Sequence, residues 1–196
     1  MQTFMINKIK AVFVFISLLV VFEATAQQSV LIVYHSETGH TEQMAAAVAE
    51  GAATINGIEV ILLSVKEVQE NDLLEASAII VGSPVHNANV SSEISAFIAS
   101  WPYEEEPLKD KMGAAFVTAG GFSAGEEVVQ LSILKSMLVF GMIVVGGPDW
   151  TQPFGASAIT GEDPFEISET GLIDAQFLDK GRALGKRVAY LVNKLQ

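Results

Sequence analysis

Short apolar segments separated by helical stretches constrain the fold of this chain more than any other feature. Four segments are apolar almost throughout and end in small or hydroxylic residues: SVLIVYHS, SAIIVGSP, GAAFVTAGG and MIVVGGP. A fifth, IEVILLS, closes with Ser64. Strands that are apolar on both faces are typical of a parallel sheet that helices cover on both sides. These segments therefore predict the strands of such a sheet.

The stretches between the apolar segments carry apolar residues at helical spacing. We expect helices over residues 41–53, 91–100, 126–139 and 174–195, and one long irregular segment over residues 146–171. Strands that alternate with helices in this way are joined by right-handed crossovers. The sequence therefore predicts an α/β fold with three layers, in which helices flank a doubly wound parallel sheet.

Residues 1–26 have the three-part pattern of a secretory signal peptide. Lys8 and Lys10 precede an apolar run over residues 11–22, and Ala24-Thr25-Ala26 has the small-x-small form of a cleavage site. The run is shorter than the ~20 residues that span a bilayer, so a retained membrane anchor is the weaker alternative. We expect cleavage after Ala26, a mature domain over residues 27–196, no stable membrane insertion of that domain, and a periplasmic or extracellular location.

The composition argues against several classes of partner and chemistry. The formal net charge is −12, which disfavours nucleic acid and anionic lipid surfaces, because both attract basic proteins. The chain has no cysteine, so disulfides, thiol catalysis and thiolate metal ligands are excluded. No other motif has the spacing of a metal site, and we predict none.

The first loop after a predicted strand, SETGHT, offers an anion site. It combines three hydroxyls and a flexible glycine with the start of a helix, whose first backbone N–H groups attract anions. No lysine follows the glycine, so the loop is not a Walker motif. A phosphate ester would be held by neutral donors. The alternative is a plain strand–turn–helix junction with a threonine as the helix N-cap.

Three loops taken together resemble those of the flavodoxin-like superfamily. SETGHT is similar to the loop that holds the phosphate of FMN, VGSPVHNANVSSE to the segment beside the isoalloxazine ring, and VTAGGFSAGEE to the glycine-rich loop across the flavin. The order and content of these loops are most similar to WrbA-type NAD(P)H:quinone oxidoreductases and to NADPH-dependent FMN reductase-like flavoproteins. The resemblance covers residues 30–195 and implies a five-stranded sheet of order 2-1-3-4-5.

The resemblance also implies which residues bind FMN. Gly120 and Gly121 would let the backbone approach a flat ring, and Pro84 would fix the turn after the third strand. Trp101 matches a family tryptophan near the substrate pocket, although an ordinary packing role is an equal alternative. The cofactor-binding residues implied are Ser36, Glu37, Thr38, Gly39, His40, Thr41, Ser83, Pro84, Val85, His86, Asn87, Thr118, Ala119, Gly120, Gly121, Phe122 and Ser123.

Several positions differ from the residues usual in this family. Thr38 replaces an aromatic residue, His86 and Asn87 replace a basic and an aromatic residue, and Phe140 stands at an expected histidine. The third loop is one residue longer. His86 remains a weak candidate for a catalytic proton donor, and a solvent-facing role is as probable for it. His35, where the first strand meets its loop, is expected to be structural.

The function implied by the resemblance is FMN-dependent electron transfer. In a quinone reductase, NAD(P)H would reduce the flavin, which would pass two electrons to a quinone or other small acceptor. The expected export conflicts with a nicotinamide donor, so the alternatives are an exported electron carrier and a flavin-binding module without turnover. The FMN loops match the family's usual residues more fully than the nicotinamide face does. We therefore expect FMN binding to be more robust than NAD(P)H oxidation. A homo-oligomer is possible by analogy with the family.

Overall fold

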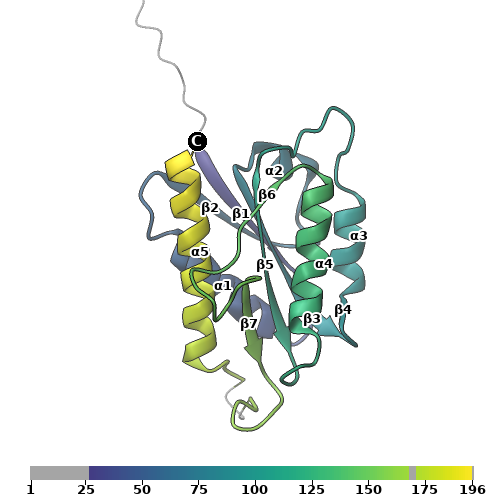
Figure 1. Ribbon diagram of the computed structural model, residues 1–196, viewed down its shortest axis with the longest axis vertical. Helices are drawn as coiled ribbons and strands as arrows, with labels where there is room; N and C mark the ends of the chain where they lie inside the picture. Colours follow the sequence, from purple (N-terminus) through teal and green to yellow (C-terminus); the bar gives the residue numbers. More distant parts are fainter. Residues whose placement is uncertain (1–26, 168–170, 196) are drawn as a thin grey trace, which may run out of the picture.

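A computed structural model describes residues 27–167 and 171–195 (Figure 1). The expected leader and its cleavage site lie outside the described residues. The strands are β1 (Gln28–Tyr34), β2 (Ile58–Ser64), β3 (Ala78–His86), β4 (Asn89–Val90), β5 (Met112–Ala119), β6 (Ile143–Val144) and β7 (Ala156–Ile159). The helices are α1 (His40–Ala52), α2 (Glu70–Glu75), α3 (Ser92–Ala99), α4 (Glu126–Val139) and α5 (Ala175–Leu195).

The sheet has the strand order β2-β1-β3-β5-β6, which confirms the expected order 2-1-3-4-5. The strands of this path are parallel, and β4 adds a short antiparallel pairing to the end of β3. The fifth position is divided: β6 pairs with Met112 and Gly113, whereas β7 pairs in parallel with the last four residues of β5. Because β7 falls inside residues 146–171, the expectation of a wholly irregular segment there is wrong.

The four long helices begin and end within one residue of the predicted ranges. The short helix α2 was not expected, because Leu73 is its only buried residue and its sequence is otherwise polar. Helices α1 and α5 cover one face of the sheet, and α3 and α4 cover the other (Figure 1). The buried strand β1 supplies both cores, with Val30 and Ile32 on the α1–α5 side and Leu31 and Val33 on the opposite side.

Helices α1 and α5 approach each other closely through glycines. A β-carbon at Gly185 would lie 1.9 Å from the carbonyl oxygen of Val48, and one at Gly51 would lie 1.9 Å from that of Arg182. The two backbones are therefore in direct contact. At the rim of this contact, Arg182 Nε donates to Glu50 Oε2 over 2.7 Å. Small residues thus decide how tightly the α1–α5 layer packs.

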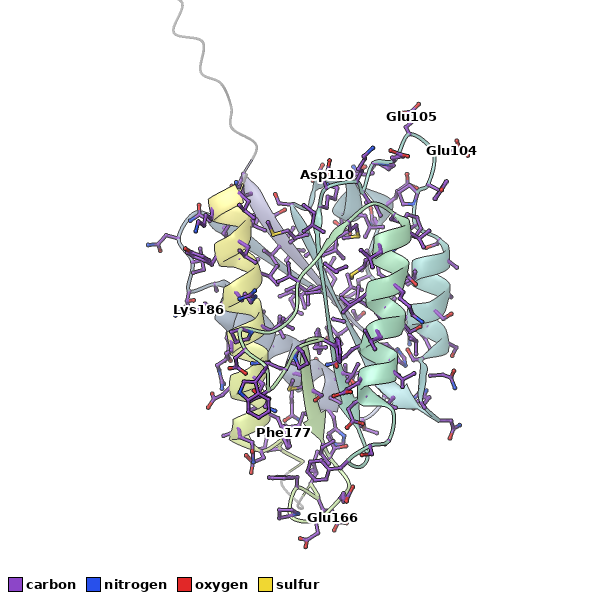
Figure 2. The ribbon with its side chains drawn as sticks, in the orientation of Figure 1. Glu104, Glu105, Asp110, Glu166, Phe177 and Lys186 are labelled. Carbon is purple, nitrogen blue, oxygen red and sulfur yellow. The ribbon has the colours of Figure 1, made fainter. Side chains whose placement is uncertain are left out.

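The topology brings the carboxyl ends of β1, β3 and β5 to one edge of the sheet. Figure 2 shows Glu166 at this end of the molecule and Glu104 and Glu105 at the other. We call the first end the carboxyl edge and the second the amino edge. Within the described part of the chain, none of the helices combines the length and apolar character needed to cross a bilayer.

Candidate functional site

The first loop, residues 36–41, leaves the start of α1 open. The helix N-cap is Gly39, in the left-handed region at φ 86°, and no side chain caps the helix. A β-carbon at Gly39 would meet no atom within 4 Å. The alternative of a threonine N-cap is therefore wrong. Inside the loop, the Gly39 N–H donates to Ser36 Oγ over 3.1 Å, and Thr38 Oγ1 lies 3.1 Å from His40 Nδ1. Glu37 is exposed.

A buried hydroxyl pair joins the first loop to the third. Thr41 Oγ1 and Thr118 Oγ1 lie 2.8 Å apart, and the two side chains are only 2% and 5% exposed. Each hydroxyl thus satisfies the other inside the protein. This contact, between residues 77 positions apart, fixes the end of β5 against the start of α1.

The second loop is a tight hairpin between β3 and β4. Pro84 lies within β3, so the expectation that it forms the turn is wrong; the turn is made by Asn87 and Ala88, at φ 51° and 60°. Positive φ at both turn residues is typical of two-residue hairpin loops, and asparagine tolerates it well. His86 and Asn87 are exposed beside this turn, and Val85 pairs with Val90 across the hairpin.

A serine buried at the base of the hairpin connects it to α3. Ser83 is fully buried; its hydroxyl donates to the carbonyl oxygen of Pro84 over 2.8 Å and accepts from the N–H of Ser91 over 3.0 Å. Ser91 in turn caps α3 by accepting from the N–H of Ile94. Ser83 therefore positions the hairpin through its hydrogen bonds.

The third loop, which follows Ala119, is closed on one side by a carboxylate that the sequence analysis did not single out. The N–H of Phe122 donates to Glu162 Oε2 over 2.6 Å, and a β-carbon at Gly121 would lie 2.6 Å from the same oxygen. Gly120 is open, with no atom within 4 Å of a β-carbon there. Ser123, at φ 58°, donates its N–H to Glu126 Oε1 over 3.0 Å.

Residues 160–167 form a fourth segment at the carboxyl edge. The N–H of Thr160 donates to the carbonyl oxygen of Ala119 over 2.9 Å, and the ring of Phe165 packs edge-on against Phe122 at 5.8 Å between centroids. This segment is irregular and polar, and no known motif marks it. A run of turn residues after a short apolar strand, ASAITGEDP, was the only signal in the sequence that could have indicated it.

The second and third loops are in contact. Gly125, at φ 107°, packs so closely against the turn of the hairpin that a β-carbon there would lie 2.4 Å from Ala88 Cβ. Together with the Thr41–Thr118 pair, this contact assembles the three predicted loops into one site. A hollow of about 280 Å³ lies beside the third loop, lined by Ser123, Gly125, Glu126, Glu127 and Val128.

Trp101 does not lie at this site within one chain. Its side chain is 4% exposed and packs edge-on against Phe97 and Phe140, at 5.6 and 5.3 Å between ring centroids. Phe140 ends α4 just before β6, whose first residue pairs with Met112 at the start of β5. Both aromatic residues therefore belong to the amino edge.

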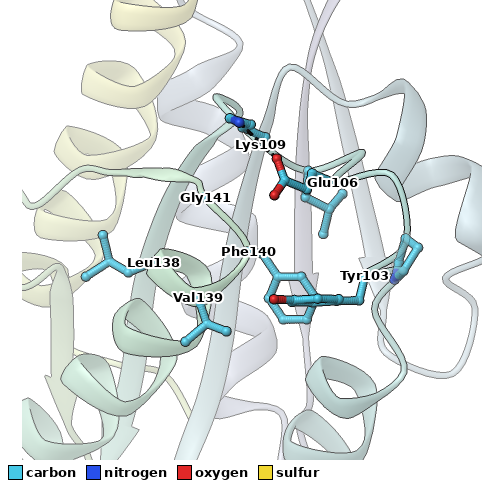
Figure 3. Close-up of a pocket in the computed structure, with 9 residues that line it drawn as sticks. Tyr103, Glu106, Lys109, Leu138, Val139, Phe140 and Gly141 are labelled. Atoms are coloured by element: carbon cyan, nitrogen blue, oxygen red, sulfur yellow. Dashed lines mark hydrogen bonds and ion pairs between the residues drawn. The ribbon is translucent and has the colours of Figure 1, made fainter.

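A separate cavity of about 230 Å³ opens at the amino edge (Figure 3). Phe140 and Tyr103 contribute rings 5.8 Å apart, and Glu106 and Lys109 form an ion pair of 2.9 Å at its rim. None of the implied cofactor-binding residues lines this cavity, which is lined by Pro102, Tyr103, Glu106, Leu108, Lys109, Leu138, Val139, Phe140 and Gly141. Over residues 27–167 and 171–195, no three His, Cys, Asp or Glu side chains are grouped to hold a metal ion.

The carboxyl edge is rich in carboxylates. Glu37 lies in the first loop, Glu93 lies in the first turn of α3, and Glu126 and Glu162 accept from the third loop. The N–H of Glu93 itself, followed by the hydroxyl of Ser92, holds the pKa of the Glu93 carboxyl below its usual range. This carboxylate is therefore ionised at neutral pH.

Comparison with known proteins agrees with this arrangement of loops. A family model described as NADPH-dependent FMN reductase matches residues 29–156, which contain all three loops. The chain belongs to this family. Over 172 residues it is 34% identical to a flavodoxin of Aquifex aeolicus, covering 82% of this chain and 84% of that protein. It is 32% identical to an NAD(P)H dehydrogenase (quinone) of Sinorhizobium fredii, covering 85% and 98% of the two chains.

Solved structures show the same fold. A flavodoxin, WrbA-like protein from Agrobacterium tumefaciens superposes with a TM-score of 0.71 at 22% identity, covering 86% of this chain and 99% of that one. A flavodoxin from the domain Archaea superposes with a TM-score of 0.65 at 26% identity, covering 85% and 99%. The resemblance to the flavodoxin-like superfamily, first drawn from three short loops, is confirmed.

Proposed function

We propose that the carboxyl edge binds FMN. The observation that carries this proposal is the open start of α1: its N-cap is a glycine, no side chain caps the helix, and the space at Gly39 is empty. Uncapped N–H groups at the positive end of a helix dipole fit a phosphate ester. The open backbone at Gly120 fits the close approach of a flat ring. The relatives' names, flavodoxin and NAD(P)H dehydrogenase (quinone), agree with such a cofactor.

Bound FMN would supply the exchange of electrons between a donor and an acceptor. The chain's own residues position it. The first loop binds the phosphate, and the Thr41–Thr118 pair holds that loop at a fixed distance from the third. The turn at Asn87 and Ala88, packed against Gly125, sets the gap between the second and third loops. The exposed His86 is a candidate for acid–base chemistry beside the gap.

We further propose oxidoreductase activity of the NAD(P)H:quinone type, on the strength of the family model and of relatives at 31 and 32% identity. A second candidate, an electron carrier without nicotinamide turnover, is favoured by the carboxylates of Glu37, Glu93, Glu126 and Glu162. These charges would repel the anionic phosphates of a dinucleotide and attract a cationic protein partner.

A titration followed by steady-state kinetics on one preparation tests both candidates. We expect FMN to bind with a shift of its visible absorption and quenching of its fluorescence, and NADH or NADPH to reduce a soluble quinone slowly. We expect slow turnover because the cofactor loops rely on backbone groups, whereas Thr38, His86 and Asn87 replace side chains that the resemblance implies at the nicotinamide face. Failure to bind FMN would overturn the proposal. Rapid turnover would exclude the carrier, and FMN binding without turnover would exclude the reductase.

We propose an exported location from the leader pattern of residues 1–26. The native protein is expected to begin at Gln27, because Ala24-Thr25-Ala26 is a small-x-small cleavage site. The intact mass of the protein isolated from its natural host measures this directly. A mass that still includes Lys8 and Lys10 would contradict both the cleavage and the location.

A further inference from the structure

A buried histidine stands between two carboxylates beside the first loop. His35 follows β1, and its side chain is only 7% exposed. Its Nε2 lies 3.6 Å from Glu37 Oε1 in the first loop and 3.4 Å from Glu93 Oε2 at the start of α3. Neither contact has the geometry of a hydrogen bond, so this buried nitrogen has no hydrogen-bond partner in the described part of the chain. A polar atom buried in this way needs a physical account.

The charges around the first loop provide a physical account of this buried nitrogen. The loop SETGHT contains no lysine or arginine, but it contains Glu37. Glu93 adds a second negative charge, and its lowered pKa keeps it ionised in mildly acid solution. An anion at the start of α1 is thus attracted by the helix dipole and repelled by two carboxylates. A cation between those carboxylates would reduce the repulsion without occupying the site.

We propose that His35, when protonated, offsets Glu37 and Glu93 and so determines the preference of this site for the phosphorylated cofactor. The inference rests on the proposed binding of FMN. His35 would act through the two carboxylates and is therefore a positioning residue. Its backbone N–H donates to the carbonyl oxygen of Gly82 over 3.2 Å, which fixes the backbone from which the buried imidazole extends.

The direction of the pH effect follows from the charges. Histidine is the side chain that gains a charge in mildly acid solution, and an imidazolium ring at this position would face two carboxylates. In mildly alkaline solution a neutral ring would leave both carboxylates to act on the bound phosphate without compensation. A charge on His86 of the hairpin would also act on Glu93. FMN binding should therefore weaken with rising pH by a component that depends on His35.

The test compares dissociation constants of FMN and riboflavin for the full chain and for His35→Gln. At about pH 5.5 we expect His35→Gln to weaken FMN binding about 10-fold, and at about pH 8.5 less than about 2-fold. Riboflavin lacks the phosphate, so its affinity should change less than about 2-fold at both pH values. The ionisation of the FMN phosphate affects the variant and the parent equally. Comparing their dissociation constants at the same pH therefore removes its contribution.

Two further variants sharpen the result. Glu93→Gln should tighten FMN binding several-fold at about pH 8.5, where the carboxylate is uncompensated, and have a smaller effect at about pH 5.5. Glu106→Gln removes a carboxylate from the amino edge, in its ion pair with Lys109, and is the matched control. It should leave both affinities unchanged.

Three outcomes would overturn the inference. They are an equal loss at both pH values for His35→Gln, an equal loss for riboflavin and FMN, and no gain from Glu93→Gln at high pH. If the parent protein binds no FMN, the proposed function fails instead. The inference about His35, which rests on that function, then fails with it.

Discussion

Replacing Gly39 with Asp is expected to weaken FMN binding by at least about 100-fold. The substitution places a carboxylate at the uncapped start of α1, where the helix dipole would otherwise attract the phosphate, and two like charges at close range repel strongly. A β-carbon at Gly39 meets no atom within 4 Å, so we expect the loss to arise at the ligand and not from a clash inside the protein. Fluorescence titration with FMN measures it.

Gly57→Asp is the matched control for this change. Gly57 has almost the same backbone conformation, φ 85° against 86°, and an equally open surrounding, but it lies in the turn between α1 and β2. Both variants carry the same cost of a positive φ, about 1 kcal/mol. Only Gly39→Asp should lose FMN, and riboflavin should lose much less affinity than FMN. Equal losses for the two ligands would mean that this loop does not hold the phosphate.

Gly185→Ala is expected to destabilise the fold by about 2 kcal/mol or more. The added methyl group would lie 1.9 Å from the carbonyl oxygen of Val48, a backbone atom that cannot rotate away. Helices α1 and α5 must therefore separate, at an overpacking cost of about 1–3 kcal/mol or more that outweighs the gain of about 1 kcal/mol in helix propensity. Urea unfolding monitored by circular dichroism gives the change in the free energy of unfolding.

The same substitution one turn earlier in α5 is the control. At Gly181 a β-carbon would lie 3.3 Å from Ala47 Cβ, a contact that small shifts relieve. Gly181→Ala should therefore be close to neutral or slightly stabilising, because the helix propensity gain is the same. If both variants lose equal stability, the close backbone contact at residue 185 is not the cause of the loss.

The carboxylate of Glu162 shows why part of the site could not be predicted from the sequence. Strand–loop–helix junctions carry local signals, such as the glycine and hydroxyls of SETGHT, and their shared edge follows from the parallel topology. The contact between Glu162 and the N–H of Phe122 joins residues 40 positions apart through an irregular segment. No periodicity marks such a contact, since it exists only once β7 has paired with β5.

Trp101 shows a related limit, because the sequence left open both a place near the substrate pocket and an ordinary packing role. Motif order along the chain indicated a position near the substrate pocket, but the eight residues of α3 carry the chain from the carboxyl edge to the amino edge before Trp101 is reached. There the ring packs between Phe97 and Phe140. The length of the helix that follows a motif decides at which edge of the sheet the next residue lies. A short motif does not contain that information.

The resemblance to the flavodoxin-like superfamily implied the strand order. The sequence by itself determined the parallel sheet, four of the helices and the three loops at the carboxyl edge. These follow from periodicity, from uninterrupted apolar strands and from junction residues, all of which act over a few positions. The tertiary structure decided the rest: the division of the fifth strand between β6 and β7, the turn at Asn87 and Ala88, the Glu162 contact, and the burial of His35 between Glu37 and Glu93. All of these except the hairpin turn depend on segments distant in sequence that meet only after the two cores have packed, so no local pattern can specify them.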